Sequence, residues 1–400
     1  MCAGGFVTLI KGKLKGKVLM IYLDNSAATA PSEEVLTSFT EVNRRFYANA
    51  ASLHRAGKDA ESLLDRSREQ ILSIVGIPDG NVIFTSGGTE ANNLALFGFA
   101  RKFVSRGKHI ITTTIEHPSI LHAAQQLEQE GFEVDYLSVD DRGLISIDEL
   151  KSKLREDTTV VSIMHVNNEI GTIQPIEECA KIIKENSRAL FHSDTIQSFG
   201  KLPVTLIEGG PDAITVSAHK IHGLKGSGAL ITRKRMTPVA INFGGGQELG
   251  IRSGTVSVPD ATALARAMRL IIENNKAEHY KLLRNRLIDF IKGTKDVIIL
   301  SEETSAPHIL SIAFHHIKGE VAVNYFQENG IIISTSSACS SKSGRAGHVI
   351  DAIGLTEKYK HGVIRISFGN YTTDEHIEQF EKVFINFTNL LERGKTYEME

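Results

Sequence analysis

The stretch VIFTSGGTEANNLALFGFARKFVSRGKHIITTTIEH, residues 82–117, contains the alternation that decides the fold. Its two ends, 82–86 and 109–117, are short runs rich in β-branched residues and predict strands, whereas 90–106 has the periodicity of a helix. A strand, a helix and a second strand in this order are typical of the crossover between parallel strands. The segment therefore predicts one unit of an α/β fold.

The same alternation continues along the chain. A helix with a proline at its start is expected at 175–186. Further apolar runs predict strands at 134–139, 160–166, 189–194, 213–219 and 228–232. We therefore expect an α/β domain with a mostly parallel sheet of seven strands.

The character of the sequence changes after the glycine cluster GGGQELGIRSGT at 244–255. A long helical stretch is expected at about 259–292, followed by shorter strands and a final helix from about 374. This pattern predicts a second, smaller α+β domain. The expected organisation is an extension at 1–19 that is disordered, an arm at 20–33 that joins the small domain, a large domain at 34–258 and a small domain at 259–400.

Bulk composition excludes several classes of protein. Lys and Arg number 45 against 47 Asp and Glu, so the chain is not a strongly basic nucleic-acid-binding protein. No apolar run reaches the roughly 18–20 residues of a membrane-spanning helix. Cys2, Cys179 and Cys339 form no CxxC pair, which excludes a disulfide-dense secreted scaffold and a four-cysteine zinc site. We expect a soluble cytoplasmic protein that has no metal site and binds neither nucleic acid nor membrane.

Candidate binding residues follow the predicted strands, because ligands of open parallel sheets bind at the carboxyl ends of strands. Gly88 and Thr89 begin a helix after the first strand, where N–H groups and a hydroxyl suit a phosphate, although an ordinary capped helix start explains them equally well. Asp194 ends another strand, with Gln197 three residues on. Its carboxylate would suit a pyridinium nitrogen or would cap the following turn.

Lys220 ends the apolar run AITVSA within SAHKIHG, residues 217–223. A desolvated lysine is the amine nucleophile that imine-forming enzymes require, although an isolated lysine at a strand end is usually solvated. A phosphate cradle, a carboxylate and a lysine at successive strand ends match the three handles of pyridoxal phosphate: its phosphate, its ring nitrogen and its aldehyde. The combination therefore favours this cofactor.

Three other residues could carry chemistry or have ordinary roles. His117 closes a strand and would stack on a flat cofactor ring or be a satisfied surface histidine. Cys339 lies in the Ser- and Gly-rich stretch 334–347, where nearby cations favour its thiolate and a mobile loop would let it collect and hand over a group. Cys179 is expected to be core packing.

Nine motifs, taken in order over about residues 20–385, make the chain resemble a NifS/IscS-like cysteine desulfurase of the class V aminotransferase superfamily. They are YLDNSAAT, FTSGGTEANN, EHPS, MHVNNEIG, HSDTIQSFGK, SAHKIHG, GGGQELGIRSGT, SSACSS and RISFGNYTT. Each motif alone is weak, but their ordered combination is specific. Leu224, in place of the usual proline, and the extra residues 1–19 depart from the family pattern.

The resemblance implies the fold type I of pyridoxal-phosphate-dependent transferases, a homodimer, and a role for each matching residue. Lys220 would carry the cofactor, His117 would stack on its ring, Asp194 would pair with the ring nitrogen and Gln197 would contact the phenolic oxygen. The phosphate cradle would consist of Gly88, Thr89, Ser217 and His219, together with Thr255 from the neighbouring subunit. Asn168 and Arg365 would bind the substrate carboxylate, although Arg365 could instead be on the outward side of a strand.

The implied activity is the conversion of L-cysteine to L-alanine, with the sulfur held as a persulfide on Cys339. An iron–sulfur scaffold or a tRNA-thiolating enzyme would accept the sulfur. A selenocysteine lyase or a class V aminotransferase would use the same cradle, and the loop cysteine argues against the latter. An idle partner-binding scaffold is disfavoured by the presence of Lys220, Asp194 and Cys339 together.

Overall fold

The computed structural model describes residues 20–204, 206, 209–335 and 347–397, so Cys339 and the expected extension 1–19 lie outside the described residues. The elements around the first sheet are α2 (Glu33–Arg45), α3 (Arg55–Ile74), β2 (Asn81–Thr85), α4 (Gly88–Lys102), β3 (His109–Thr113), α5 (Pro118–Gln129), β4 (Glu133–Leu137), α6 (Ile147–Lys153), β5 (Thr158–Ser162), α7 (Ile176–Asn186), β6 (Leu190–Asp194), β7 (Ala213–Ser217), the 3-10 turn η1 (Ala218–Lys220), β8 (Gly228–Thr232), the 3-10 turn η2 (Glu248–Gly250) and α8 (Val258–Glu273). The other elements are β1 (Ile21–Tyr22), α9 (Ala277–Ile291), β9 (Val297–Ile299), β10 (Ile309–Phe314), α10 (Gly319–Glu328), β11 (Ile331–Ile332), β12 (Ser334–Thr335), α11 (His348–Ala352), α12 (Glu357–Lys360), β13 (Val363–Ser367) and α13 (Asp374–Tyr397).

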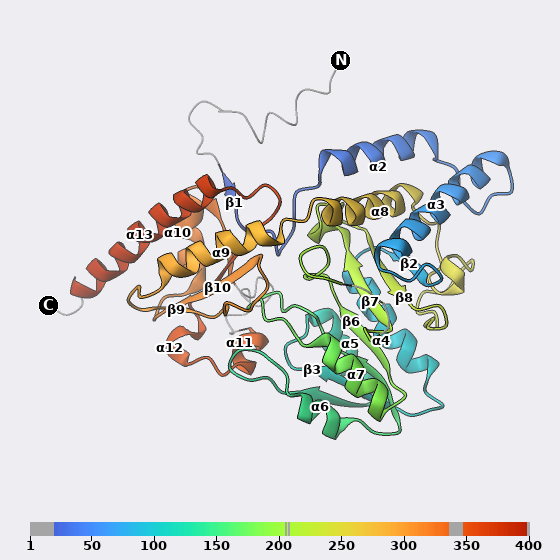
Figure 1. Ribbon diagram of the computed structural model, residues 1–400, viewed down its shortest axis with the longest axis horizontal. Coiled ribbons are helices and arrows are strands. Elements are labelled where there is room, and N and C mark those ends of the chain that lie inside the picture. The colour runs from blue at the N-terminus through green and yellow to red at the C-terminus, as the bar shows by residue number, and fades with distance from the viewer. Residues whose placement is uncertain (1–19, 205, 207–208, 336–346, 398–400) are drawn as a thin grey trace, which may run out of the picture.

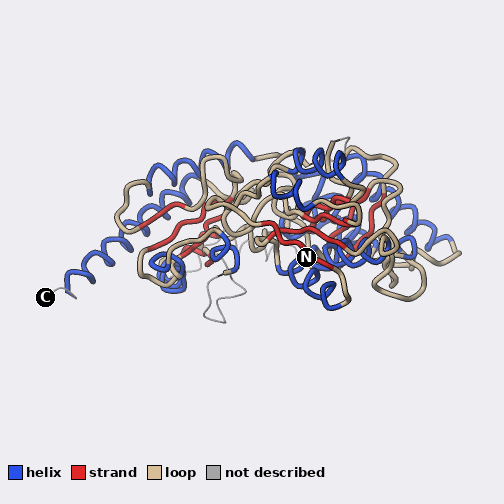
Figure 2. The backbone as a smooth tube through the Cα atoms, turned by 90° about the horizontal axis from the view of Figure 1, so that it is seen from below, coloured by secondary structure: helices blue, strands red, loops and turns tan. Residues whose placement is uncertain are grey.

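The larger sheet has seven strands in the order β2-β8-β7-β6-β5-β3-β4 among the described residues. Only β8 runs against its neighbours, so the other six strands point the same way. Strands β3, β5, β6 and β7 are buried along their whole length, as expected of parallel strands with helices on both faces. Figure 2 shows the strands as a layer between helices. The sheet confirms the expected α/β class.

The smaller sheet is antiparallel, in the order β12-β13-β10-β9 in the described part of the chain. Its core is rich in aromatic side chains that α10 and α13 contribute: Phe326, Phe380, Phe384 and Phe387. The first strand, β1, pairs in parallel with β11, so the N-terminal arm lies among C-terminal elements (Figure 1).

Two details differ from the expectations. The stretch expected as one helix over 259–292 is two helices, because α8 ends at Glu273 and α9 starts at Ala277. The Asn275 side chain accepts a hydrogen bond from the N–H of Ala277 at 2.9 Å and so stabilises the turn between the two helices. In addition, α8 packs on α2 and α3 in the core of the larger sheet. A domain boundary at 258 stays a prediction, and this packing favours a boundary after α8.

Candidate functional site

The site lies where six strands of the larger sheet end, and Lys220 is at its centre. Lys220 closes η1, directly after the fully buried strand β7. Its side chain is half-buried, and Nζ donates hydrogen bonds to the main-chain oxygens of Ser26 and, at 2.9 Å, Ala27. These two carbonyl groups hold the amine at the centre of the site.

The N-terminal arm forms one wall of this site. Gln197 donates to the same Ser26 oxygen at 3.0 Å, so the arm bridges two of the expected cofactor residues. His222 fixes the arm, because its Nδ1 donates to the oxygen of Ala30 at 2.8 Å and its Nε2 accepts from the N–H of Asn370 at 3.2 Å. This tautomer is neutral, and burial lowers the pKa of His222 to about 4. His222 thus joins three distant parts of the chain.

Asp194 ends β6 and is 5% exposed. One carboxylate oxygen accepts from the N–H of Ile196 at 2.9 Å, which is the turn-capping role, and the other accepts from Nδ2 of Asn92 at 2.7 Å. Burial raises the pKa of Asp194, although these hydrogen bonds and the nearby His117 and Lys220 favour its charged form. All its hydrogen-bond donors are neutral, so the carboxylate can still bind a cationic group.

His117 caps the start of α5 and is connected to Asp194 by a chain of hydrogen bonds. Nδ1 of His117 accepts from the N–H of Ser119 at 3.2 Å and contacts its Oγ at 2.8 Å, while Asn92 donates to that Oγ at 2.9 Å and also to Asp194. Since Nδ1 is an acceptor, the neutral ring carries its proton on Nε2. Burial lowers the pKa of His117, so the neutral form is favoured. Asn92 and Ser119 lie inside quoted motifs, but sequence reasoning did not select them.

The expected phosphate cradle is divided between one buried part and one exposed part. Gly88 begins α4, and a Cβ added there would lie 2.2 Å from Cδ1 of Ile196 and 3.4 Å from Cβ of Ser217. Ser217 Oγ is 2.9 Å from Nδ1 of His219, whose pKa burial lowers to about 4. These residues therefore come together. Thr89 and Thr255 are exposed in the described chain, Thr255 in the loop after η2.

Arg365 lies on the buried strand β13, not on an outward face, and is 4% exposed. It donates to the main-chain oxygen of Asn168 at 2.7 Å and to Oδ1 of Asp24 at 2.9 Å. Nε of Arg365 is buried and has no hydrogen-bond partner among the described residues. A planar group with one unused N–H suits a carboxylate ligand. The structure thus brings Asn168 and Arg365 together, and Asn167 instead stabilises the turn by accepting from the N–H groups of Glu169 and Ile170.

The residues on either side of the segment that contains Cys339 lie at this site. Ser334, on β12, pairs with Arg365 on β13, and Nη2 of Arg365 is 3.4 Å from its Oγ. After that segment, Nε2 of His348 contacts the main-chain oxygen of Glu116 at 2.8 Å. The chain therefore leaves the described part beside Arg365 and returns next to His117.

Two buried charged residues at the site were missed from the sequence. Glu116 is fully buried, accepts from the N–H of Met164 at 2.7 Å, and burial raises its pKa to about 8. Lys201 is 6% exposed and donates to the main-chain oxygen of Lys220 at 2.7 Å. Both lie inside quoted motifs, Glu116 in EHPS and Lys201 at the end of HSDTIQSFGK, but sequence reasoning did not select them.

The residues present fit pyridoxal phosphate. Asp194 is a buried acceptor whose donors among the described residues are neutral, and the half-buried amine of Lys220 lies at the same site. The amide oxygen of Gln197 is buried and lacks a hydrogen-bond partner within the described ranges. Such orphaned polar groups are costly unless a ligand completes them.

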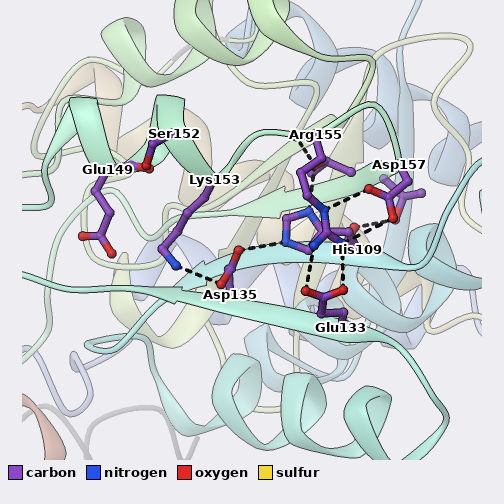
Figure 3. Close-up of polar contacts among 10 residues, drawn as sticks. His109, Glu133, Asp135, Glu149, Ser152, Lys153, Arg155 and Asp157 are labelled. Atoms are coloured by element: carbon purple, nitrogen blue, oxygen red, sulfur yellow. Dashed lines mark hydrogen bonds and ion pairs between the residues drawn. The ribbon is translucent and has the colours of Figure 1, made fainter.

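A second group of charged residues lies at the opposite, amino-terminal edge of the same sheet, and we call it the edge network (Figure 3). Its members are His109, Glu133, Asp135, Lys153, Arg155 and Asp157. Asp135 accepts from Lys153 at 2.9 Å and contacts Nε2 of His109 at 3.1 Å. Arg155 binds both carboxylate oxygens of Glu133, at 2.7 and 2.9 Å, and also Asp157 at 2.9 Å. Each carboxylate here has a basic partner.

Comparisons with known proteins indicate the family of the chain. Residues 21–380 match the model of the aminotransferase class-V family. A cysteine desulfurase IscS from Klebsiella pneumoniae subsp. pneumoniae is 39% identical over 368 residues, which cover 90% of each chain. A solved NifS-like protein is 36% identical with a TM-score of 0.86, over 93% of this chain and 99% of that one. SspA in complex with cysteine is 32% identical with a TM-score of 0.77, over 88% of this chain and 100% of that one.

Proposed function

We infer the function from the family: the chain belongs to the aminotransferase class-V family, among the NifS/IscS-like cysteine desulfurases, which are pyridoxal-phosphate enzymes. We propose that it converts L-cysteine into L-alanine and takes the sulfur onto Cys339 as a persulfide. The observation that carries this proposal is the meeting of Lys220, Asp194 and His117, from three strand ends, in one half-buried site.

The proposed reaction is balanced without an external oxidant. The Cβ–S bond of the substrate breaks, an S–S bond forms on Cys339, and the thiol proton lost from the enzyme is matched by a proton gained at Cβ. Pyridoxal phosphate, when bound, accepts the electron pairs that the substrate releases and so lowers the barrier to bond breaking.

Lys220 and His117 are the proposed proton-transfer groups. The Lys220 amine takes the proton from Cα, because two main-chain carbonyl groups hold it at the centre of the site. His117 carries a proton on Nε2, since its Nδ1 is occupied by Ser119, and can therefore donate it to the substrate. Asp194 would pair with the cofactor ring nitrogen, and Gln197 would contact its phenolic oxygen.

Arg365 would bind the substrate carboxylate, with Asn168 beside it. Its unused Nε supports this role. Because Asp24 and the oxygen of Asn168 already hold the guanidinium, the side chain would not have to be ordered by the substrate. This pre-organisation lowers the entropic cost of binding.

The position of Ser334 supports the proposed role of Cys339. Cys339 is four residues after Thr335, the last residue of β12, and four extended residues span at most about 14 Å. Since Ser334 contacts Arg365, a chain of this length would allow the thiol to reach the substrate site. Delivery of the sulfur to an iron–sulfur scaffold or to a tRNA-thiolating enzyme remains part of the proposal.

We propose that the chain acts as a homodimer in which Thr255 completes the phosphate cradle of the neighbouring subunit. Thr255 is exposed in its own chain. Two loops present large apolar side chains to solvent, Leu53 at 89% and Phe243 at 88% exposure, and Phe243 is in the same connection between β8 and α8 as Thr255. Exposed apolar groups of this size are typical of protein interfaces.

The deciding experiment is incubation with L-cysteine followed by peptide mass spectrometry. One added sulfur on the peptide with Cys339, together with alanine in equal amount, is expected in the wild-type protein. Cys339→Ser should keep cofactor binding but lose both products, whereas Cys179→Ser, the matched control, should keep them because Cys179 is fully buried. Sulfide and alanine from Cys339→Ser at the wild-type rate would contradict the persulfide mechanism.

A further inference from the structure

Lys201 is a second buried lysine, next to the proposed cofactor lysine. It follows β6, is 6% exposed, and its Nζ donates to the main-chain oxygen of Lys220 at 2.7 Å. Within the described ranges this is its one side-chain hydrogen bond, and none of the ion pairs there includes Lys201. A buried ammonium without a carboxylate partner is costly, so its retention calls for an explanation.

The backbone around Lys201 is held firmly in place. Gly200 has φ +75°, and a Cβ added there would lie 2.5 Å from Cγ1 of Ile271 on α8. The oxygen of Gly200 accepts from Nδ2 of Asn275 at 3.2 Å, and the N–H of Lys201 donates to Ser198 at 3.0 Å. The turn therefore fixes the direction of the Lys201 side chain, toward Lys220.

Among the titratable groups near Lys201, Lys220 is the main one that is charged. Burial lowers the pKa values of His219 and His222 to about 4 and that of His308 well below its usual range, so all three imidazoles are neutral at pH 7. The groups that act on Lys220 itself include Asp194 and His117 on the far side of the site. Lys220 is thus the charged group that acts on the Lys201 amine, whose Nζ contacts the main chain of the same residue.

We propose that Lys201 is a positioning residue for Lys220, which fixes the main chain of Lys220 by its hydrogen bond and, as a neighbouring cation, favours the uncharged amine of Lys220. The inference rests on the proposed role of Lys220. Two like charges in a buried site disfavour each other, and a nearby cation is a known means of activating a lysine nucleophile. Burial and the charge of Lys220 lower the pKa of Lys201 to about 7. The two amines therefore compete for protons near neutral pH.

The test measures the amine of Lys220 directly, in the full-length chain without cofactor. Acetic anhydride labels only uncharged amines, and peptide mass spectrometry gives the labelling of Lys220 against pH. Lys201→Gln retains a hydrogen-bond donor but removes the charge, so the Lys220 midpoint should rise by about one pH unit. Lys201→Arg retains both features and should leave the midpoint within about 0.3 unit of wild type. An unchanged midpoint in Lys201→Gln would overturn the proposal.

A reciprocal measurement decides the matter if the glutamine variant fails to fold. Coupling between two sites is equal in both directions, so Lys220→Ala should raise the labelling midpoint of Lys201 by the same amount. No change there would also overturn the inference. A failure of the proposed function can be distinguished from a failure of this inference. In the first case, borohydride would fix the cofactor to a lysine other than Lys220.

Discussion

The two edges of the larger sheet handle buried charge in opposite ways. At the amino-terminal edge, the carboxylates of the edge network each have a basic partner, such as Lys153 for Asp135. At the carboxyl-terminal edge, Asp194 and Glu116 are held by neutral N–H and hydroxyl groups, and Lys201 by a carbonyl oxygen. The first edge is electrostatically complete. At the carboxyl-terminal edge, these charged groups have neutral partners, so only a ligand or a proton can neutralise them. This difference distinguishes a binding site from a structural cluster.

The largest expected effect follows from removing the central amine. Lys220→Ala should lower L-cysteine turnover by about 10³-fold or more, because in the proposed mechanism the same side chain holds the cofactor and moves the Cα proton. Alanine formation measures the loss. In the wild-type protein, borohydride should fix the cofactor to Lys220. Recovery of the cofactor on another lysine would contradict the assignment of the carboxyl-terminal edge as the binding site.

A matched pair of carboxylate substitutions compares the two edges directly. Asp194→Asn removes a charge whose described partners are neutral and should lower turnover by about 10²-fold, because the proposed ionic contact with the cofactor would be lost. Asp135→Asn removes a charge of the edge network and should leave turnover within about twofold of wild type. Side-by-side kcat/KM values measure both, and equal losses would show that the distinction between the edges has no functional meaning.

The two edges should also differ in how pH affects their stability. Burial raises the pKa of Glu116 to about 8, so the folded state binds a proton that the unfolded state has released between about pH 5 and 8. The wild-type protein therefore loses stability as pH rises through this window, by up to about 1.4 kcal/mol per pH unit from this group. Glu116→Gln should remove that loss, so the variant gains stability relative to wild type from pH 6 to pH 8.

Glu133 provides the control of opposite sign. Its hydrogen bonds with Arg155 lower its pKa, so its contribution to stability is present at neutral pH and is lost as pH falls through its folded pKa. Urea unfolding of both glutamine variants at pH 4, 6 and 8 measures the two slopes. A Glu116→Gln variant that followed the wild-type slope would mean that Glu116 is already ionised in the folded protein.

The smallest effect is expected from Lys153→Met at the edge network. Lys153 and Asp135 are each 30% exposed, and ion pairs in contact with water contribute at most about 1 kcal/mol. Turnover should not change, because Lys153 lies at the edge of the sheet opposite Lys220. Thermal unfolding and a kinetic assay on the same preparation check both expectations. A loss of turnover would show that the two edges of the sheet are energetically coupled.

The sequence predicted what is local and missed what depends on distant contacts. Strand ends with Asp194 and Lys220 were identifiable, because β-branched runs and the polar residues after them are adjacent in the chain. Glu116 was not, because its burial depends on Met164, 48 residues away. The break between α8 and α9 was also missed, since Asn274 and Asn275 stand where glycine or proline would mark a helix end more clearly.

The N-terminal arm contacts residues that are synthesised late, so this site can be completed only near the end of translation. Asn25 donates to the oxygen of Ser367, 342 residues later, and Asp24 pairs with Arg365. At about 5–20 residues per second, a ribosome needs roughly 17–70 s to make the intervening chain. During translation the larger sheet can form and hold the arm through Gln197 and His222, while the N–H of Ser26 still lacks its partner, Ser367. We therefore expect the wall of the site to be fully fixed only after β13 has emerged and paired.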